Sequence, residues 1–317
     1  MDENRIELEK NILSYGLDRA GFNQTGNQQA SLELKRQRFV AFFGVCPSTC
    51  AAIFLALKAD SELGNDCRLI YFLATMCWLK NYITERVLAG MFAMSENTIR
   101  KWIWTYAKML QSLKSTKVCV TSLFFFLFLN HFVICKTISF FFKISLDLDD
   151  DVQNTFILSV DGTHCRIEEP RSIPDKKWYS HKLNKPGISY EIAPHLFKNK
   201  VAWVNGPFQA GQSDLHIFRS EGGLKSRIPP GKLVIADKGY NGESEVVSTP
   251  NDFDTDAVKV FKQRARARQE SFNSRIKEFK ILSQCFRSKH DLHGIVFEAV
   301  CVIAQFSLEN GRPLMEL

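Results

Sequence analysis

The chain has nine cysteines but no CxxC pair, and no cysteine pair stands at zinc-finger spacing ahead of its histidines. The cysteine count is odd and most of the thiols lie among apolar residues, which favours reduced thiols of an intracellular protein over a disulfide framework. The first residues, MDENRIELEKN, lack the apolar stretch of a signal peptide, so none is expected. The net charge is only +7, and this excess indicates a polyanionic partner only where it is clustered.

The composition is that of a globular protein, with 45% hydrophobic and 24% charged residues in 317 positions. This length accommodates two ordinary domains. The sequence predicts a polar, loosely ordered leader at 1–35 and a helical region at 36–114. A phenylalanine-rich insertion with an acidic linker follows at 115–151, and an α/β domain at 152–317.

The segment Thr84–Tyr106 has the organisation of a helix-turn-helix at residues 84–106. Thr84 and Ser95 are placed to cap two short helices with apolar inner faces. The small residues Ala89 and Gly90 stand where such helices must approach closely, which favours this interpretation over an ordinary helical hairpin. On the second helix, the outward side chains suited to base edges and phosphates are Asn97, Arg100 and Lys101.

The segment Val118–Phe142 contains eight phenylalanines and has no clear period. Its first part, Val118–Cys135, is long enough for a membrane span, although Asn130 and His131 interrupt it. A buried linker helix is a second interpretation. We favour a third, a translated intron, because phenylalanine codons are pyrimidine-rich like the tract before a splice acceptor. Excising 118–143 would keep the reading frame, and no stable membrane association is then expected.

Two apolar runs of strand type each end at an aspartate. Phe156–Val160 precedes Asp161-Gly162, and Lys232–Ala236 precedes Asp237. Asp-Gly alone is a common turn dipeptide, but two such strand ends followed by Glu270 on a helix indicate a shared site. Carboxylates are the ligands that Mg²⁺ prefers, and two ions roughly 3.5–4 Å apart suit phosphodiester cleavage.

The predicted helix Ala257–Cys285 lies in the most basic part of the chain. Ten basic residues fall between Lys259 and Lys289 against two glutamates, as a polyanionic substrate requires. The alternatives are a solvated helix face for the basic run and an i, i+4 partnership with Arg266 for Glu270. The residues predicted to contact nucleic acid here are Arg264, Arg266, Arg268, Arg275 and Lys277.

Three motifs in this order, VDGTHCRI, IADKGY and RARQESFNSRIKEF, resemble the DDE nuclease domain of PIF/Harbinger-type transposases and their domesticated nuclease relatives. The similarity runs from about Phe156 to the C-terminus, and Thr84–Tyr106 resembles the preceding helix-turn-helix. The resemblance implies an RNase H-like domain, a mixed sheet flanked by helices, after an all-α region. It implies that Asp161, Asp237 and Glu270 form the catalytic triad. In AGQSDLHIF, glutamine-serine replaces the family's histidine before Asp214, so Asp214 is expected only to support the triad.

The resemblance also implies the activity and its partners. It predicts a Mg²⁺- or Mn²⁺-dependent endonuclease, with two ions, that cuts double-stranded DNA at transposon ends and joins the 3′-hydroxyl to target DNA. A nuclear location, a homo-oligomer and an accessory Myb-like DNA-binding protein are further implications. Two rival hypotheses are a catalytically inactive, domesticated DNA-binding protein and a membrane-anchored protein built on Val118–Cys135.

Overall fold

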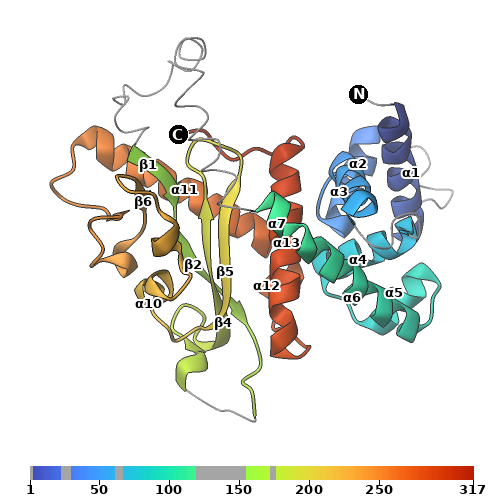
Figure 1. Ribbon diagram of the computed structural model, residues 1–317. Helices are drawn as coiled ribbons and strands as arrows, with labels where there is room; N and C mark the ends of the chain where they lie inside the picture. The colour runs from blue at the N-terminus through green and yellow to red at the C-terminus, as the bar shows by residue number, and fades with distance from the viewer. Residues whose placement is uncertain (1–2, 23–29, 61–66, 119–154, 172–175) are drawn as a thin grey trace. The chain divides into compact units, whose positions relative to one another are not determined.

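The computed structural model describes residues 3–22, 30–60, 67–118, 155–171 and 176–317, which group into two compact units. The helical unit comprises 1–117, 165–168 and 275–313, and the sheet unit comprises 118–164, 169–274 and 314–317. The helices assigned to the first unit, drawn in Figure 1, are α1 (Glu3–Arg19), α2 (Leu32–Phe43), α3 (Pro47–Asp60), α4 (Leu69–Asn81), α5 (Glu85–Phe92), α6 (Glu96–Ser112), α7 (Lys114–Lys117), α12 (Lys280–Ser283) and α13 (His293–Glu309).

Helix α1 contradicts the prediction of a loosely ordered leader, at least for residues 3–19. Ile12 and Leu17 are buried on the face that packs against α2 and α3. Gly16 permits the close approach, because a Cβ at this position would fall 2.5 Å from the ring of Phe39. The prediction failed because the polar residues of the segment outnumber the few apolar positions that anchor it.

The two helices predicted at 84–106 form as α5 and α6. The Thr84 hydroxyl accepts a hydrogen bond from Val87 N, and the Ser95 hydroxyl accepts one from Thr98 N. One detail of the prediction is wrong. An added Cβ at Gly90 would meet nothing within 4 Å, so this glycine marks no close approach.

Helix α13 is the core helix of the helical unit. Its apolar side chains are almost all buried, and it packs against α6 and α3. Among the described residues, His290–Glu309 is the one single helix long and apolar enough to cross a membrane, and 72% of its apolar stretch is buried inside the protein. The bent pair α2–α3 is also long and apolar enough if the two helices are counted as one span. The predicted insertion, with the hypotheses attached to it, falls almost wholly on 119–154 and so lies outside the described residues.

The sheet unit is built on two joined sets of strands. β1 (Phe156–Ser159), β6 (Leu233–Ile235) and β7 (Val247–Ser248) are parallel neighbours in the order β1-β6-β7. β2 (Asp161–Arg166) pairs with β4 (Lys185–Pro194), which pairs with β3 (Tyr179–Ser180) and, antiparallel, with β5 (Val201–Gln209). Leu158 bridges to His195 just past β4, which connects the two sets.

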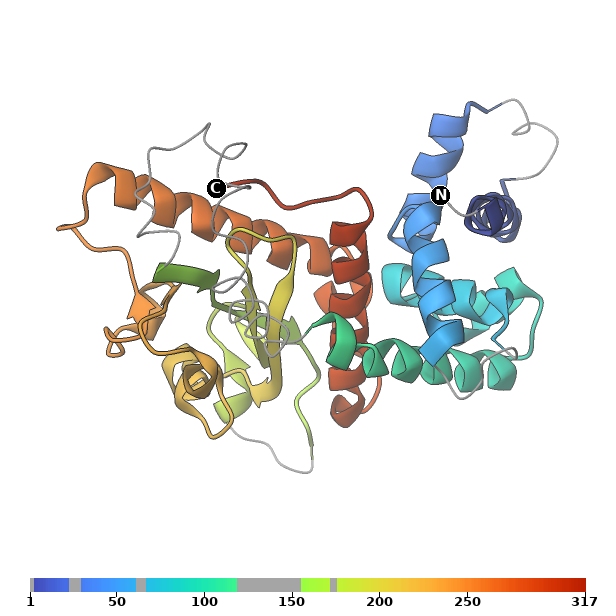
Figure 2. The ribbon, with the colours of Figure 1, turned by 45° about the horizontal axis from the view of Figure 1, so that its top comes forward.

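Helices cover both faces of this sheet. The side chains of β6 alternate, with Ile235 facing α11 (Asp256–Lys277) and Val234 facing the opposite layer. That opposite layer contains α10 (Asp214–Arg219), the 3₁₀ turn Leu224–Arg227 and the 3₁₀ turn Lys238–Tyr240. Figure 2 shows α11 as a long helix lying along the sheet. The predicted α/β class, with helices ahead of the sheet, is confirmed.

Candidate active site

Asp161 and Asp237 lie close together because β1 and β6 are parallel neighbours whose carboxyl ends meet. The amide of Val160 donates to the carbonyl of Ile235 at 2.9 Å, which holds the two strand ends in register. Asp161 is the first residue of β2, so the chain passes directly from one strand to the next. This continuity excludes the alternative that Asp161-Gly162 forms a hairpin turn.

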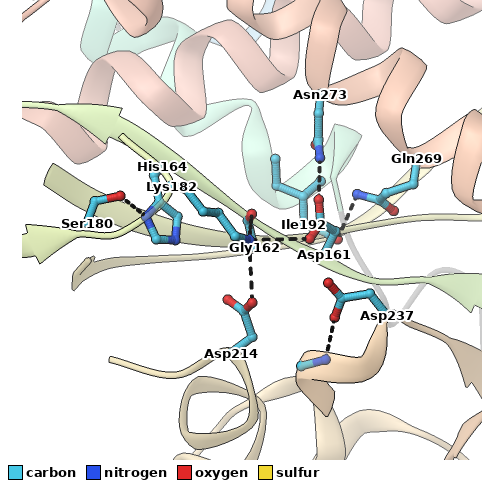
Figure 3. A network of polar contacts seen from close by, with 11 residues as sticks. Asp161, Gly162, His164, Ser180, Lys182, Ile192, Asp214, Asp237, Gln269 and Asn273 are labelled. Carbon is cyan, nitrogen blue, oxygen red and sulfur yellow. Dashed lines mark hydrogen bonds and ion pairs between the residues drawn. The ribbon is translucent and has the colours of Figure 1, made fainter. Parts of the chain in front are cut away.

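The carboxylate of Asp237 caps the 3₁₀ turn that follows β6. Its Oδ1 accepts a hydrogen bond from Gly239 N at 2.8 Å, which leaves the other oxygen toward the side where Asp161 lies (Figure 3). A Cβ at Gly239 would fall 2.9 Å from Asp237 Oδ1, so a glycine suits this tight cap. The IADKGY motif therefore positions its aspartate through local backbone geometry.

Helix α11 is fastened across the strand ends by two amide side chains one turn apart. Gln269 is buried, accepting from the Ser159 hydroxyl at 2.8 Å and donating to Ile192 O at 3.3 Å. Asn273 donates from Nδ2 to Asp161 Oδ2 at 2.9 Å, a contact visible in Figure 3. These contacts orient the helix and one oxygen of Asp161.

Glu270 follows Gln269 and lines the same cavity as the two aspartates, a hollow of about 350 Å³. The structure therefore brings the three predicted triad residues, Asp161, Asp237 and Glu270, to one site. No ion pair joins Glu270 to Arg266 within the part of the chain that the structure describes. The alternative that Glu270 serves only as the i, i+4 ion-pair partner of Arg266 is thus not realised in this structure.

Asp214, at the start of α10, is a fourth carboxylate at this site. Its Oδ1 approaches the backbone of β2 so closely that a Cβ at Gly162 would lie 2.1 Å away. The glycine of the VDGTHCRI motif is therefore required by the packing of Asp214 against the strand. Ser213 caps α10 by accepting from His216 N at 3.2 Å, and this fixes the start of the helix.

Lys182 is a cation in contact with two of these carboxylates. Its Nζ lies 3.5 Å from Asp214 Oδ2 and 3.8 Å from Asp161 Oδ1, and it donates to the carbonyl of Gly162 at 3.0 Å. Burial raises the pKa of Asp161 to about 6; Lys182 opposes this increase, whereas Asp214 and Asp237 add to it. Burial likewise raises the pKa of Asp214. The four carboxylates of the site thus outnumber the two cations, Lys182 and Arg266, that adjoin them.

The donor chemistry of this site fits a hard divalent cation. Its side chains offer carboxylate oxygens, and the raised pKa of Asp161 reflects burial and repulsion that a cation would relieve. Among the described residues, no group of three or more His, Cys, Asp or Glu side chains is arranged to enclose an ion. The site therefore fits a divalent cation in the type and charge of its donors, although its carboxylates do not converge on a single ion position.

The basic residues of α11 divide into two classes that the sequence could not distinguish. Arg268 is 2% exposed and donates to the carbonyls of His195, Lys198 and Met315. Three others also hold backbone carbonyls. Arg264 donates to Glu316 O, Arg275 to Arg312 O and Pro313 O, and Lys277 to Leu282 O and to Cys165 Sγ. Arg266 is exposed and lines the carboxylate cavity.

The predicted DNA-contacting residues of α6 also differ from one another. Arg100 pairs with Glu85 at 2.6 Å, and Arg86 pairs with Glu96 at 2.9 Å, so these four charges are matched across α5 and α6. Asn97 and Lys101 are exposed, and the Lys101 ammonium lies 5.2 Å from the Trp102 ring centroid. The outward orientation of all three predicted residues is confirmed, although Arg100 is engaged by a carboxylate.

Sequence reasoning did not identify Lys182, Gln269 or Asn273. Lys182 lies in a turn between β3 and β4, within a polar stretch that has no periodic pattern. Gln269 and Asn273 are one helical turn apart and flank Glu270, a spacing that could have indicated a polar face directed at the strand ends.

Comparison with known proteins bears on the same part of the chain. No curated protein and no solved structure gives a significant match. Residues 160–305, a little under half of the chain, match the family model of the DDE superfamily endonuclease, and this stretch includes Asp161, Asp237 and Glu270 but not the segment 84–106.

Proposed function

We propose that this protein is a metal-dependent DNA endonuclease of the PIF/Harbinger transposase type with an RNase H-like catalytic domain. The observation that carries the proposal is the meeting of Asp161, Asp237 and Glu270 at one cavity of about 350 Å³, at the carboxyl ends of β1 and β6. The mixed sheet with helices on both faces and the family match over 160–305 support it.

Asp161 and Asp237 would hold a divalent ion, and Glu270 would contribute to a second. When bound, such ions supply Lewis-acid polarisation of the phosphate and a water of lowered pKa. The chain's own residues prepare the site. Asn273 fixes one oxygen of Asp161, and Lys182 offsets part of the carboxylate charge and offers a cation to a phosphate.

In the proposed reaction, the phosphodiester of a transposon end enters this cavity and is hydrolysed, and the freed 3′-hydroxyl then attacks target DNA. Asn97 and Lys101 on α6, with Arg266 on α11, are the exposed residues that this proposal assigns to DNA. A nuclear location, a homo-oligomer and an accessory Myb-like protein belong to the same proposal through the family resemblance alone.

Replacing Asp161 with asparagine tests the proposal. Asp161→Asn keeps the shape of the side chain but removes the charge, so Mg²⁺-dependent nicking of DNA should be abolished while DNA binding is largely retained. Nicking by purified full chain is compared with and without EDTA. Asp18→Asn, on the exposed face of α1, is the matched control and should nick at the wild-type rate. Retained cleavage by Asp161→Asn would refute the assignment. Absence of cleavage in the wild type would favour the inactive DNA-binding alternative.

A further inference from the structure

Phe253 is the most exposed large apolar side chain among the described residues, at 94%. It lies in the loop between β7 and α11, on the chain between Asp237 and Glu270. A single exposed apolar residue is ordinary on a protein surface. The case for a function therefore rests on how this loop is held and on what adjoins it.

The loop is fixed although its tip is fully exposed. Asn251 Oδ1 accepts from Phe253 N at 3.1 Å, and Asp254 Oδ2 accepts from Asn251 N at 3.0 Å. Beneath them, Lys262 is 4% exposed and donates to Asp254 at 2.8 and 3.0 Å and to Thr249 O at 2.9 Å. A buried cation thus anchors the loop to α11, and the short hydrogen-bonded turn holds Phe253 outward.

The anchored loop adjoins a small cavity of about 120 Å³ beside α11. Both Asn251 and Asp254 line this cavity, as do Lys259, Gln263 and Arg266. Arg266 also lines the cavity that contains the three carboxylates. One arginine therefore borders both the Phe253 loop and the candidate active site, all within the sheet unit.

The cations that line the small cavity, and not the loop tip, favour a polyanion. Of the charged side chains lining the small cavity, Lys259, Lys262 and Arg266 are cationic and Asp254 is anionic, and Asp254 is bound by Lys262. Lys259 and Arg266 are left exposed. Asp252 and Asp256 beside Phe253 are exposed carboxylates that would repel a phosphate, so the contact assigned to the loop tip is the ring of Phe253 alone.

We propose that Phe253 is a stacking site for an unpaired DNA base next to the phosphodiester that enters the carboxylate cavity, with Lys259 and Arg266 on the flanking phosphates. The inference rests on the proposed function. Aromatic side chains stack on bases of any sequence, and neighbouring cations follow the backbone. In an intact duplex the bases are stacked on one another, so Phe253 distinguishes DNA that is gapped or opened at the site of cleavage.

The test measures binding of the full chain to two probes in EDTA, where no cleavage occurs. One probe is an intact duplex, and the other is the same duplex with a short single-stranded gap that contains 2-aminopurine. The wild type should prefer the gapped probe and quench its fluorescence. Phe253→Ala should lose about 5- to 150-fold in affinity for the gapped probe alone, the effect of one base–aromatic stack of about 1–3 kcal/mol. Phe253→Trp should restore both the affinity for the gapped probe and the quenching of its 2-aminopurine fluorescence.

Leu32→Ala is the matched control, since Leu32 is 56% exposed on α2 and should leave both probes unaffected. Equal affinity of wild type and Phe253→Ala for the gapped probe overturns the inference. An equal loss on both probes overturns it too, as does a change in oligomeric state alone, which would mark a protein interface. If the gap preference depends on Phe253 but no cleavage occurs in Mg²⁺, the proposed nuclease function fails and the stacking site stands.

Discussion

Lys182 illustrates what a single residue does at this site. Its ammonium group contacts the carboxylates of Asp161 and Asp214 and donates a hydrogen bond to the carbonyl of Gly162. The side chain is nevertheless 48% exposed, and the two carboxylate contacts are long, at 3.8 and 3.5 Å. A half-exposed ammonium at such distances is weakly held. It can therefore exchange carboxylate contacts for a phosphate without a large loss of folding free energy.

Glu191 is a buried carboxylate on β4 whose titration should affect stability. One oxygen accepts from Trp203 Nε1 at 2.9 Å, and Oε1 has no hydrogen-bond partner among the described residues. Burial raises its pKa from 4.5 to about 7, opposed by the Trp203 hydrogen bond and assisted by Asp214. Between these values the folded chain binds a proton that the unfolded chain does not. Stability should therefore fall as the pH rises through this window, by up to about 3 kcal/mol for this group.

The substitution Glu191→Gln should remove this contribution because the amide stays neutral at every pH. The variant should match the wild type at about pH 4, below both pKa values. At about pH 8 it should be more resistant to urea, because the wild type has by then lost up to about 3 kcal/mol of stability. Urea unfolding midpoints at both values measure it. Glu221→Gln, at an exposed position, should follow the wild type. Parallel curves for the wild type and Glu191→Gln would contradict the prediction.

At the scale of elements, the sequence predicts more about where helices and strands form than about where their side chains point. The positions of α5 and α6, the start of α11 and the strand ends at Asp161 and Asp237 follow from caps and from apolar periodicity. The predicted end of the basic helix at Cys285 is wrong, because α11 ends at Lys277 and α12 follows it. The direction of Arg268 does not follow from the sequence, since a run of basic residues looks the same whether it faces solvent or backbone. Carbonyls of irregular segments need donors, and an arginine supplies several at once.

Arg268 and Arg266 are therefore expected to behave as opposites on the same helix. Arg268→Met removes the Arg268 donor from the carbonyl of His195 and one of the two donors to the carbonyl of Lys198, which Lys200 N also contacts at 2.8 Å. The loss of these buried contacts should destabilise the chain by about 2–4 kcal/mol. Its DNA affinity, where it folds, should change little. Arg266→Met should leave stability unchanged and weaken DNA binding. The slope of the logarithm of the binding constant against the logarithm of the salt concentration should become shallower by about 0.9, for one lost phosphate contact.

Thermal unfolding and DNA binding over a series of salt concentrations measure the two effects, and each variant is the control for the other. If a folded Arg268→Met protein loses as much DNA affinity as Arg266→Met, the division of α11 into structural and substrate-facing arginines is wrong.

At the scale of the whole molecule, the phenylalanine-rich segment can be tested at its first residue, Val118. Val118, the first residue of the excised stretch in the translated-intron hypothesis, is 5% exposed. After excision of 118–143, Ile144 would follow Lys117 directly. A branched apolar residue would thus occupy the buried place of Val118 with one additional methylene, a change that cores tolerate when space allows.

The shortened chain should therefore fold and should nick DNA at least as well as the full chain, with higher soluble yield because eight phenylalanines are absent. Thermal unfolding, yield and Mg²⁺-dependent nicking of the two chains provide the comparison. A chain without 118–143 that carries Val in place of Ile144 is the control for the junction. If both shortened chains fail to unfold cooperatively while the full chain does, the segment belongs to the fold. Mature transcripts that retain the segment in abundance would contradict the translated-intron hypothesis.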